Sequence, residues 1–381
     1  MDRSLAPAEQ DVLERACAFA DTHVAGRPDL GLTPDFPQDI WGAMGRAGLL
    51  GAAVPVGYAG AGCGYRAVGV IGRELTRRGG CLGLTLSWVM HQIVCRFVFA
   101  AQANDDQKRT CLPRLASGEI TASLAISEPG AGAHPKHLKT SARRVRGGYV
   151  IEGEKSFITN GPIARLFVTV AVSGMEGTRK LFSAFLVPSD REGLRVGPVM
   201  DVGFLRPCPH CTIELDGCVV AEGELLGRPG AAYDDMVLPF RDVEDVSMMG
   251  PIAGAQEARM GLLARALRGV SPHTCDRAAC ALGEIAADTA AMRVLADEAA
   301  FTLDSRGRCE DLTTLVIAFR RLVETVHRGI SQLASCEGVV QEEPLRTLGM
   351  DTERLTRFAG KVMEVKKAKI GRRLVDHPGH P

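Results

Sequence analysis

The chain has 381 residues, of which 46% are hydrophobic and 24% are charged. That composition excludes general disorder and allows a sizeable core divided over two or three domains. Lys and Arg number 45, and Asp and Glu number 45, so the formal net charge is zero. A zero balance argues against a protein that coats a nucleic-acid duplex and against a polybasic membrane protein. We therefore expect no nucleic-acid partner.

The first residues, MDRSLAPAEQDVLERA, are charged and predict the start of a helix, not a signal peptide. The most apolar segment, residues 79–95, is short for a membrane span and contains Ser, Thr, His and Gln. We expect a buried helix there and no membrane insertion. Twelve cysteines are scattered from Cys17 to Cys336 without a secretory signal, a pattern typical of reduced thiols in a cytoplasmic protein.

One cysteine pair has the spacing of a metal site. Cys208 and Cys211 form a CxxC, but a zinc site needs a second close pair, and none follows. The His and Cys residues between positions 273 and 280 could complete such a site only from a distance. We predict ordinary strand cysteines and no metal.

The predicted elements fall into three groups along the chain. Helical signals predict helices at 41–50, 65–77, 82–100 and 105–115. Short β-type runs follow at 123–127, 142–146, 149–151, 166–172, 183–187 and 212–215, with a hairpin turn at Gly147-Gly148. The helical period then returns, with one apolar face from Val246 to Leu267 and further helices at 278–303, 312–334 and 352–374. We therefore predict a helical domain at 1–120, a β domain at 121–230 and a helical domain at 231–381.

Several residues could carry chemistry, and each also has a purely structural explanation. The glycine turn at Gly132 is weak evidence for a phosphate site, because no clear helix follows it. The basic cluster at 134–139 is more typical of a solvated surface. His91, in an apolar helix, is typical of a core histidine. Glu244 and Asp245 open a helix, where acidic residues usually stabilise the helix dipole.

Two linked motifs change these interpretations. The stretch from Ser123 to Ala171 contains SEPGAGAH and then G-x-x-x-x-G-x-K-x-F-I-T-N, and it resembles the flavin-binding core of the acyl-CoA dehydrogenase family. The resemblance extends outward to Gly-Leu-Leu-Gly at 48–51, Arg-Glu-Leu at 73–75 and Leu-Arg at 205–206, and it covers essentially the whole chain. It implies an α+β fold with an N-terminal helical domain, a middle β-barrel-like domain and a C-terminal four-helix bundle.

The resemblance also implies an FAD site and a thioester site. The residues that would contact the cofactor are Ile126, Ser127, Phe157, Thr159, Gln332 and Lys361. The residues that would contact the substrate are Trp88, Met90, His91, Ala133 and His134.

Some positions depart from the family pattern. Ala133-His134 stands where the family has Ser-Asp, Ser335-Cys336 stands where it has Gly-Gly, and Lys361 replaces a Thr. Residues 266–274 have no counterpart of the Arg-x-x-Phe-Gly that reaches the FAD of a neighbouring subunit. These departures bear on FAD affinity and on the usual tetramer contacts, and they favour a specialised substrate.

The catalytic base follows from the same resemblance. The usual base, a Glu in the last helical segment, falls on Ala359, which could still offer its backbone N–H to the substrate carbonyl. One branch, which includes isovaleryl-CoA dehydrogenase and carrier-protein prolyl dehydrogenases, carries its base ten residues before a helix glycine. Glu244 stands ten residues before Gly254 and matches that position. We expect the adjacent Asp245 to raise the pKa of the Glu244 carboxyl.

The resemblance therefore implies an oxidoreductase flavoprotein that dehydrogenates the α,β bond of an acyl thioester. Glu244 would take the α-proton, and FAD would take the β-hydride. The pocket-floor residues Trp88 to Met90 favour a short, branched or cyclic acyl group. The implied partners are an acyl-CoA or an acyl carrier protein, an electron-transfer flavoprotein, and copies of the chain in a homodimer or homotetramer. Two alternatives stay open: an altered, inactive relative that binds a thioester or a partner, and a flavin monooxygenase on the same fold.

Overall fold

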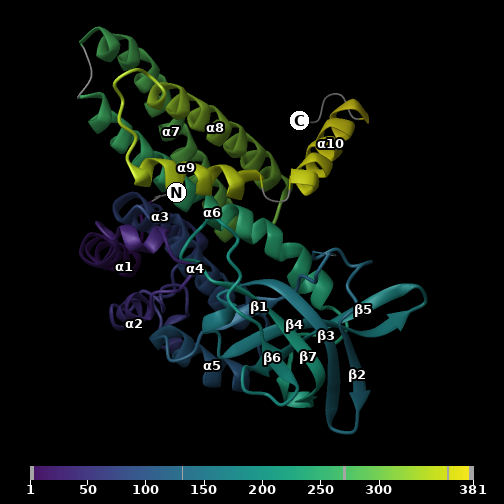
Figure 1. Ribbon diagram of the computed structural model, residues 1–381. Helices are drawn as coiled ribbons and strands as arrows, with labels where there is room; N and C mark the ends of the chain where they lie inside the picture. Colours follow the sequence, from purple (N-terminus) through teal and green to yellow (C-terminus); the bar gives the residue numbers. More distant parts are fainter. Residues whose placement is uncertain (1–3, 131, 269–271, 358–359, 377–381) are drawn as a thin grey trace.

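The computed structural model describes residues 4–130, 132–268, 272–357 and 360–376 (Figure 1). Its first part is helical: α1 (Pro7–Phe19), α2 (Gln38–Arg46), α3 (Tyr65–Gly79), α4 (Leu82–Ile93) and α5 (Asp105–Ser117). Short 3-10 or π-helical turns lie at Ala20–Val24, Pro28–Gly31, Val56–Tyr58, Val94–Ala100, Gly161–Ile163, Glu222–Glu224 and Tyr233–Val237. The predicted helix at 41–50 begins and ends earlier than expected, because Pro37 precedes its first turn and Ala47 caps its last.

The apolar segment predicted as a buried helix is confirmed as one. Every residue of α4 is buried, and a π-helical segment continues it to Ala100. Leu82–Ala100 is long and apolar enough to span a membrane, but 89% of its most apolar window is buried inside the protein. This segment therefore supplies the core between the helices and the sheet.

The middle part is a mixed sheet of eight strands. They are β1 (Ala122–Ala125), β2 (Ser141–Val145), β3 (Gly148–Thr159), β4 (Leu166–Glu176), β5 (Arg179–Pro188), β6 (Leu194–Val196), β7 (His210–Ala221) and β8 (Leu225–Leu226). The strand order is β6-β7-β3-β2-β4-β5-β8, and β1 pairs in parallel with β4. The predicted hairpin joins β2 to β3 through Gly147, whose φ of 84° lies in the left-handed region that glycine tolerates.

The sheet curves around a core of its own. Tyr149 of β3 lies 5.0 Å, ring centre to ring centre, from Phe185 of β5, although β2 and β4 lie between these strands in the sheet order. Side chains from β7 share the same core. The opposite face of β4 and β5 packs on α5 and the end of the α4 segment. These contacts agree with the barrel-like middle domain that the sequence predicted.

The last part is helical again: α6 (Leu238–Leu267), α7 (Pro272–Arg306), α8 (Glu310–Ala334), α9 (Glu343–Arg357) and α10 (Gly360–Asp376). Helices α6 to α9 pack on one another (Figure 1). Helix α10 projects from this group and contacts it through α8 and through the ion pair of Lys366 with Asp242 on α6. The single helix predicted at 352–374 is wrong: the structure describes two helices, α9 up to Arg357 and α10 from Gly360, and they run in different directions (Figure 1). The helical, β, helical order is confirmed, and the domain limits near 120 and 230 stay a prediction.

Candidate functional site

A cavity of about 870 Å³ lies where the three parts of the chain meet. Its walls come from α4, β1 and the loop after it, β3, the start of β7, α6, α8, α9 and α10. Most of the α4 and α6 surface inside it is apolar, with Leu86, Met90, Met248, Met249 and Ile252. An apolar cavity with a few polar groups is the usual form of a site for a cofactor or a small substrate.

The sheet wall of this cavity is made by a β-bulge. The pairing of β3 with β7 shifts register between Lys155 and Ile158, and Phe157 adopts a φ of 54° there. A bulge re-aims the side chain that it carries. Phe157 is 57% exposed and lines the cavity together with Thr159 and Ser127. The bulge therefore points the Phe157 ring into the cavity and away from the hydrophobic core.

The same wall leaves one buried polar group unsatisfied. Ser156 is 4% exposed and lines the cavity, and its Oγ has no hydrogen-bond partner among the described residues. Buried hydroxyls are usually hydrogen-bonded, so this atom is available to a bound molecule. A planar aromatic cofactor with polar edges, such as a flavin, would find a ring to stack on and a hydroxyl to bond. The residues of this wall therefore fit the flavin that the sequence implies.

A buried ion pair holds this wall from behind. Lys155, fully buried, donates from Nζ to Glu128 Oε1 at 2.9 Å and to the Ile126 carbonyl at 3.1 Å. The Glu128 carboxylate also accepts from the backbone N–H groups of Lys139 and Thr140. Burial alone would raise the pKa of Glu128, but the Thr140 hydrogen bond and the Lys155 charge outweigh burial and lower it. The pair therefore ties the loop after β1 to β3.

The helical wall carries the candidate base. Glu244 lies on α6, lines the cavity, and has a quarter of its side-chain surface exposed. Its Oε2 accepts from Arg241 Nη1 at 3.0 Å. Burial is the largest influence on the Glu244 carboxyl and raises its pKa, Asp245 raises it further, and the charges of Arg241 and Arg320 oppose the rise. A raised pKa makes this carboxylate a better proton acceptor.

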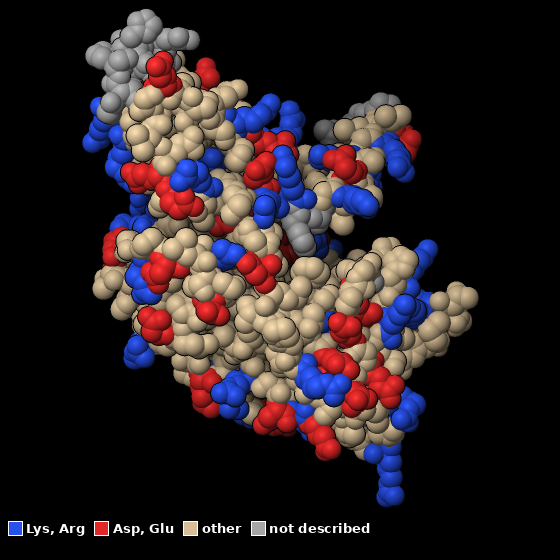
Figure 2. Space-filling view, in the orientation of Figure 1, with Lys and Arg blue, Asp and Glu red and all other residues tan. Residues whose placement is uncertain are grey.

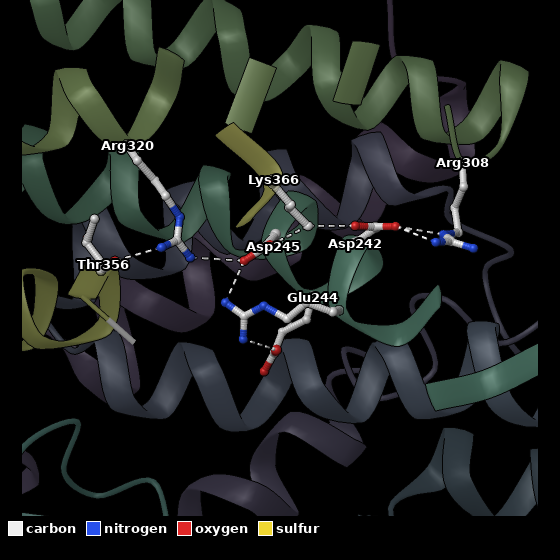
Figure 3. A network of polar contacts seen from close by, with 8 residues as sticks. Asp242, Glu244, Asp245, Arg308, Arg320, Thr356 and Lys366 are labelled. Atoms are coloured by element: carbon white, nitrogen blue, oxygen red, sulfur yellow. Dashed lines mark hydrogen bonds and ion pairs between the residues drawn. The ribbon is translucent and has the colours of Figure 1, made fainter. Parts of the chain in front are cut away.

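Asp245 belongs to the same network, which Figure 3 shows. Its Oδ1 accepts from Arg241 Nη2 at 2.7 Å and from Arg320 Nη2 at 3.1 Å. Its Oδ2 lies 3.6 Å from Lys366 Nζ on α10. Arg241 therefore divides its two Nη groups between the two carboxylates, so Asp245 limits how fully Arg241 can neutralise Glu244.

The other carboxylates near this network are less suited to take a proton. Asp242 does not line the cavity, and it pairs with Lys366 at 2.8 Å and Arg308 at 2.7 Å. Asp201 lines the cavity, but its hydrogen bond from Arg206 lowers its pKa. Glu364 is exposed on α10 and pairs with Lys367. Glu244 is thus the carboxylate on this wall that combines a raised pKa with access to the cavity.

The structure brings many of the predicted site residues together. Eight of them line the cavity: Met90, Ile126, Ser127, Ala133, His134, Phe157, Thr159 and Glu244. Gln332 on α8 and Lys361 on α10 are exposed and lie outside the cavity lining. Ala359 lies outside the described residues.

Trp88 and His91 are not brought to the cavity. Both are fully buried, and their ring nitrogens bond to backbone carbonyls, Trp88 Nε1 to Leu49 and His91 Nε2 to Leu115. Burial lowers the pKa of His91 to about 4, so the ring is neutral. Both side chains face the core of the N-terminal helices, which agrees with the interpretation of His91 as a core histidine.

Sequence reasoning missed other residues of the cavity. Arg241 and Arg320 join the acidic pair, and His210 lines the cavity as the register partner of Thr159. Arg241 stands three residues before Glu244, a spacing at which helix side chains meet, so this pairing could have been found. Arg320 carried no such signal, because it comes from another helix.

Comparisons with known proteins agree with this fold. The family profile described as acyl-CoA dehydrogenase, N-terminal domain, matches residues 6–119, and the profile for the middle domain matches residues 123–218. Together these profiles cover more than half of the chain. The chain belongs to the acyl-CoA dehydrogenase family.

Individual relatives agree with that assignment. The chain is 34% identical over 220 residues to a mitochondrial isovaleryl-CoA dehydrogenase of Solanum tuberosum, covering 57% of this chain and 53% of the relative. It is 35% identical over 245 residues to an L-prolyl-[peptidyl-carrier protein] dehydrogenase of Pseudomonas fluorescens, covering 64% and 62%. The aligned part thus spans between about half and two thirds of these relatives.

The fold extends over the whole chain in a solved structure. Butyryl-CoA dehydrogenase from Megasphaera elsdenii superposes with a TM-score of 0.88 at 19% identity, covering 98% of this chain and 100% of that one. The acyl-CoA dehydrogenase fold predicted from the sequence is therefore confirmed, including its C-terminal helical part.

The shared arginine leads to a prediction about pH. In Asp245→Asn the negative charge that raises the pKa of Glu244 is lost, and Arg241 is freed to neutralise Glu244 more fully. The pKa of Glu244 falls. Because a base acts only when deprotonated, the acid limb of the pH profile for flavin reduction moves to lower pH. The measurement is the anaerobic rate of flavin reduction across that limb, and an unshifted limb would show that Asp245 does not act on Glu244.

Proposed function

We propose that this protein is an FAD-dependent dehydrogenase that oxidises the α,β bond of an acyl thioester. One arrangement supports the proposal: the Glu244 carboxylate on α6 and the ring and hydroxyl groups of Phe157, Ser156 and Thr159 line the same cavity from two different walls. The family resemblance assigns a flavin to the second of these walls. The reaction needs a proton acceptor and a hydride acceptor that can both reach one substrate.

The roles of the residues follow from that arrangement. FAD, when bound, supplies the acceptor for the β-hydride. Phe157 and Thr159 would hold the flavin ring, and Ser127 and Ile126 would border its polar edge. Glu244 would hold the α-proton on its carboxylate, with Arg241 keeping the side chain in place. The backbone N–H of Ala359, at the family's usual base position, remains our candidate donor to the thioester carbonyl.

The carrier of the acyl group is the next part of the proposal. The relatives named above are called after isovaleryl-CoA and after a prolyl group on a peptidyl-carrier protein. We propose that this chain likewise accepts a coenzyme A or carrier-protein thioester. An electron-transfer flavoprotein as the electron acceptor and a homodimer or homotetramer remain predictions of the same resemblance.

Anaerobic flavin reduction tests the function. The purified protein should be yellow, and an acyl thioester added under nitrogen should bleach the flavin absorbance band. A protein that carries no flavin after loading with FAD would be the inactive relative. A flavin that resists every thioester under nitrogen but turns over with oxygen and a reductant would indicate the monooxygenase.

The acyl chain should be short, branched or cyclic. The acyl end of the cavity would be closed by Leu86 and Met90 of α4 and by Met249 and Ile252 of α6. Large side chains there limit the length that fits without displacing a packed core. Butyryl, isovaleryl and prolyl thioesters should reduce the flavin at least about tenfold faster than a dodecanoyl thioester, since that factor is only about 1.4 kcal/mol of binding in the transition state. Equal rates for the dodecanoyl thioester would overturn the size limit.

A further inference from the structure

The loop after β1 and the strand β2 form one continuous basic segment. Between Glu128 and Glu152 the sequence has five Lys or Arg residues and no Asp or Glu. All five cations are exposed. Arg144 pairs with Glu222 at 2.8 Å, whereas the other four have no ion-pair partner among the described residues. We call these four the basic strip: Lys136, Lys139, Arg143 and Arg146.

The basic strip begins at the cavity. Ala133 and His134 line the cavity, and Lys136 follows two residues later. From Lys139 the chain runs along β2 to Arg146 at the hairpin turn, roughly 20 Å at about 3.3 Å per residue. The strip therefore leads from the cavity lining out to the hairpin turn between β2 and β3.

Hydrogen bonds to its backbone fix the conformation of the loop that carries the strip. Glu128 accepts the backbone N–H groups of Lys139 and Thr140 at 2.6 and 2.9 Å. Lys180 on β5 donates from Nζ to the carbonyls of Lys136 and Leu138 at 3.1 and 2.7 Å. Because these bonds use backbone atoms, the side chains of Lys136 and Lys139 remain in solvent. A preorganised array of cations loses little conformational freedom when it binds a partner.

The charge and length of the strip indicate the kind of partner. The chain as a whole is neutral, and acidic and basic side chains are mixed over the face seen in Figure 2. The strip has four cations without ion pairs to the described residues, and the three from Lys139 to Arg146 alone span roughly 20 Å, which exceeds what one or two phosphate groups would occupy. Such an array complements an acidic protein surface and steers its approach. Glu152 on the same face of the sheet, beside Ser141, sets one border of the strip.

We propose that the basic strip is the docking surface for an acidic acyl-carrier domain, which delivers its thioester arm past His134 into the cavity. This proposal rests on the proposed dehydrogenase function, since a carrier domain would be its substrate carrier. Docking through the strip and chemistry in the cavity use different residues. The two can therefore be tested separately.

The first test measures docking without chemistry. The probe is an acidic stand-alone peptidyl carrier domain in its apo form, which has no thioester arm, titrated into the FAD-loaded protein. Neutralising the strip should weaken binding at least about tenfold at low salt, because attraction between exposed charges raises the association rate by about 10–10³-fold. Raising the salt should weaken binding to the parent and have little effect on the variant. The variant carries K136Q, K139Q, R143Q and R146Q.

A matched control removes the same charge elsewhere. Four exposed arginines on the helical part, away from the sheet, are replaced by glutamine and should leave carrier binding unchanged: R265Q, R268Q, R321Q and R328Q. If the strip variant binds the carrier domain as tightly as this control variant does, the strip does not govern binding, and the proposal is overturned.

The second test links docking to catalysis. The strip variant should show a KM for the carrier-bound substrate raised at least about tenfold, and an unchanged rate of flavin reduction by the N-acetylcysteamine thioester of the same acyl group. That small thioester has neither a protein nor a phosphate for the strip to hold. A KM raised for the coenzyme A thioester but not for the carrier-bound one would show that the strip serves the coenzyme A phosphates, and would overturn docking.

Failure of the proposed function gives a different result. If no thioester, small or carrier-bound, reduces the flavin of the parent protein, the dehydrogenase assignment falls. Binding of the apo carrier domain by the parent and its loss in the strip variant would still support the docking surface. If the parent and the strip variant bind the apo carrier domain equally tightly, the docking proposal is overturned, whether or not a thioester reduces the flavin.

Discussion

Glu244→Gln should keep the fold and the bound flavin but slow flavin reduction by an acyl thioester at least about 10³-fold, within the range expected for a positioned general base. Glutamine has almost the shape of glutamate, and its Oε1 can still accept the hydrogen bond that Arg241 gives to Glu244. What it lacks is a carboxylate that can take the α-proton. The measurement is the single-turnover rate of flavin bleaching under nitrogen.

The same helix offers a matched control. Glu257 also lies on α6, is half-buried, and has a pKa raised chiefly by burial, but it lies outside the flavin-side cavity. Glu257→Gln should therefore reduce its flavin at nearly the parent rate. If Glu244→Gln also does so, Glu244 is not the base, and Asp245 becomes the next carboxylate to replace. If Glu244→Gln causes the protein to lose its flavin, Glu244 has a structural role instead.

The order of elements could be predicted because each group of residues has its own period. Alternation in the middle part and a three- or four-residue spacing at both ends are local properties of the sequence. The division between α9 and α10 was less visible, since the helical period continues through the sequence from residue 352 to 374. Periodicity alone does not show where a helix changes direction.

The part of the cavity wall made by α4 could be predicted from the sequence only in part. The sequence placed the pocket floor on the segment around Trp88, and that segment does reach the cavity. However, Leu86 and Met90 face the cavity, whereas Trp88 faces the core. Residues four apart share a face of a helix, and the residue midway between them points away. When both faces of a helix are apolar, as in α4, only the packed structure decides which one lines the cavity.

The polar groups around Glu244 depend on contacts between distant parts of the chain. Arg320 comes from α8 and Lys366 from α10, and both reach carboxylates on α6 (Figure 3). No local pattern joins these positions. The motif around Phe157 identified the ring, but its exposure follows from a register shift between β3 and β7, which is a property of the pairing.

The ion pair behind the flavin wall leads to the second large effect. Lys155→Met should lower the free energy of unfolding by about 3–5 kcal/mol, because it leaves the Glu128 carboxylate buried without its cation. It also removes the hydrogen bond from Lys155 Nζ to the Ile126 carbonyl, which holds the loop beside Ser127. We expect the variant to lose most of its FAD on gel filtration. Denaturant unfolding followed by circular dichroism measures the stability.

A double variant separates the charge from the packing. In Glu128→Gln with Lys155→Met no net charge remains buried. The N–H groups of Lys139 and Thr140 bond to separate oxygens of Glu128, so the single Gln oxygen can keep one of these two hydrogen bonds. Breaking a buried pair costs more than removing both charges, so the double variant should be more stable than Lys155→Met alone. If Lys155→Met is as stable as the parent and keeps its FAD, the pair does not support the flavin wall. If the double variant is no more stable than the single one, the loss comes from packing around the methionine and not from the unpaired carboxylate.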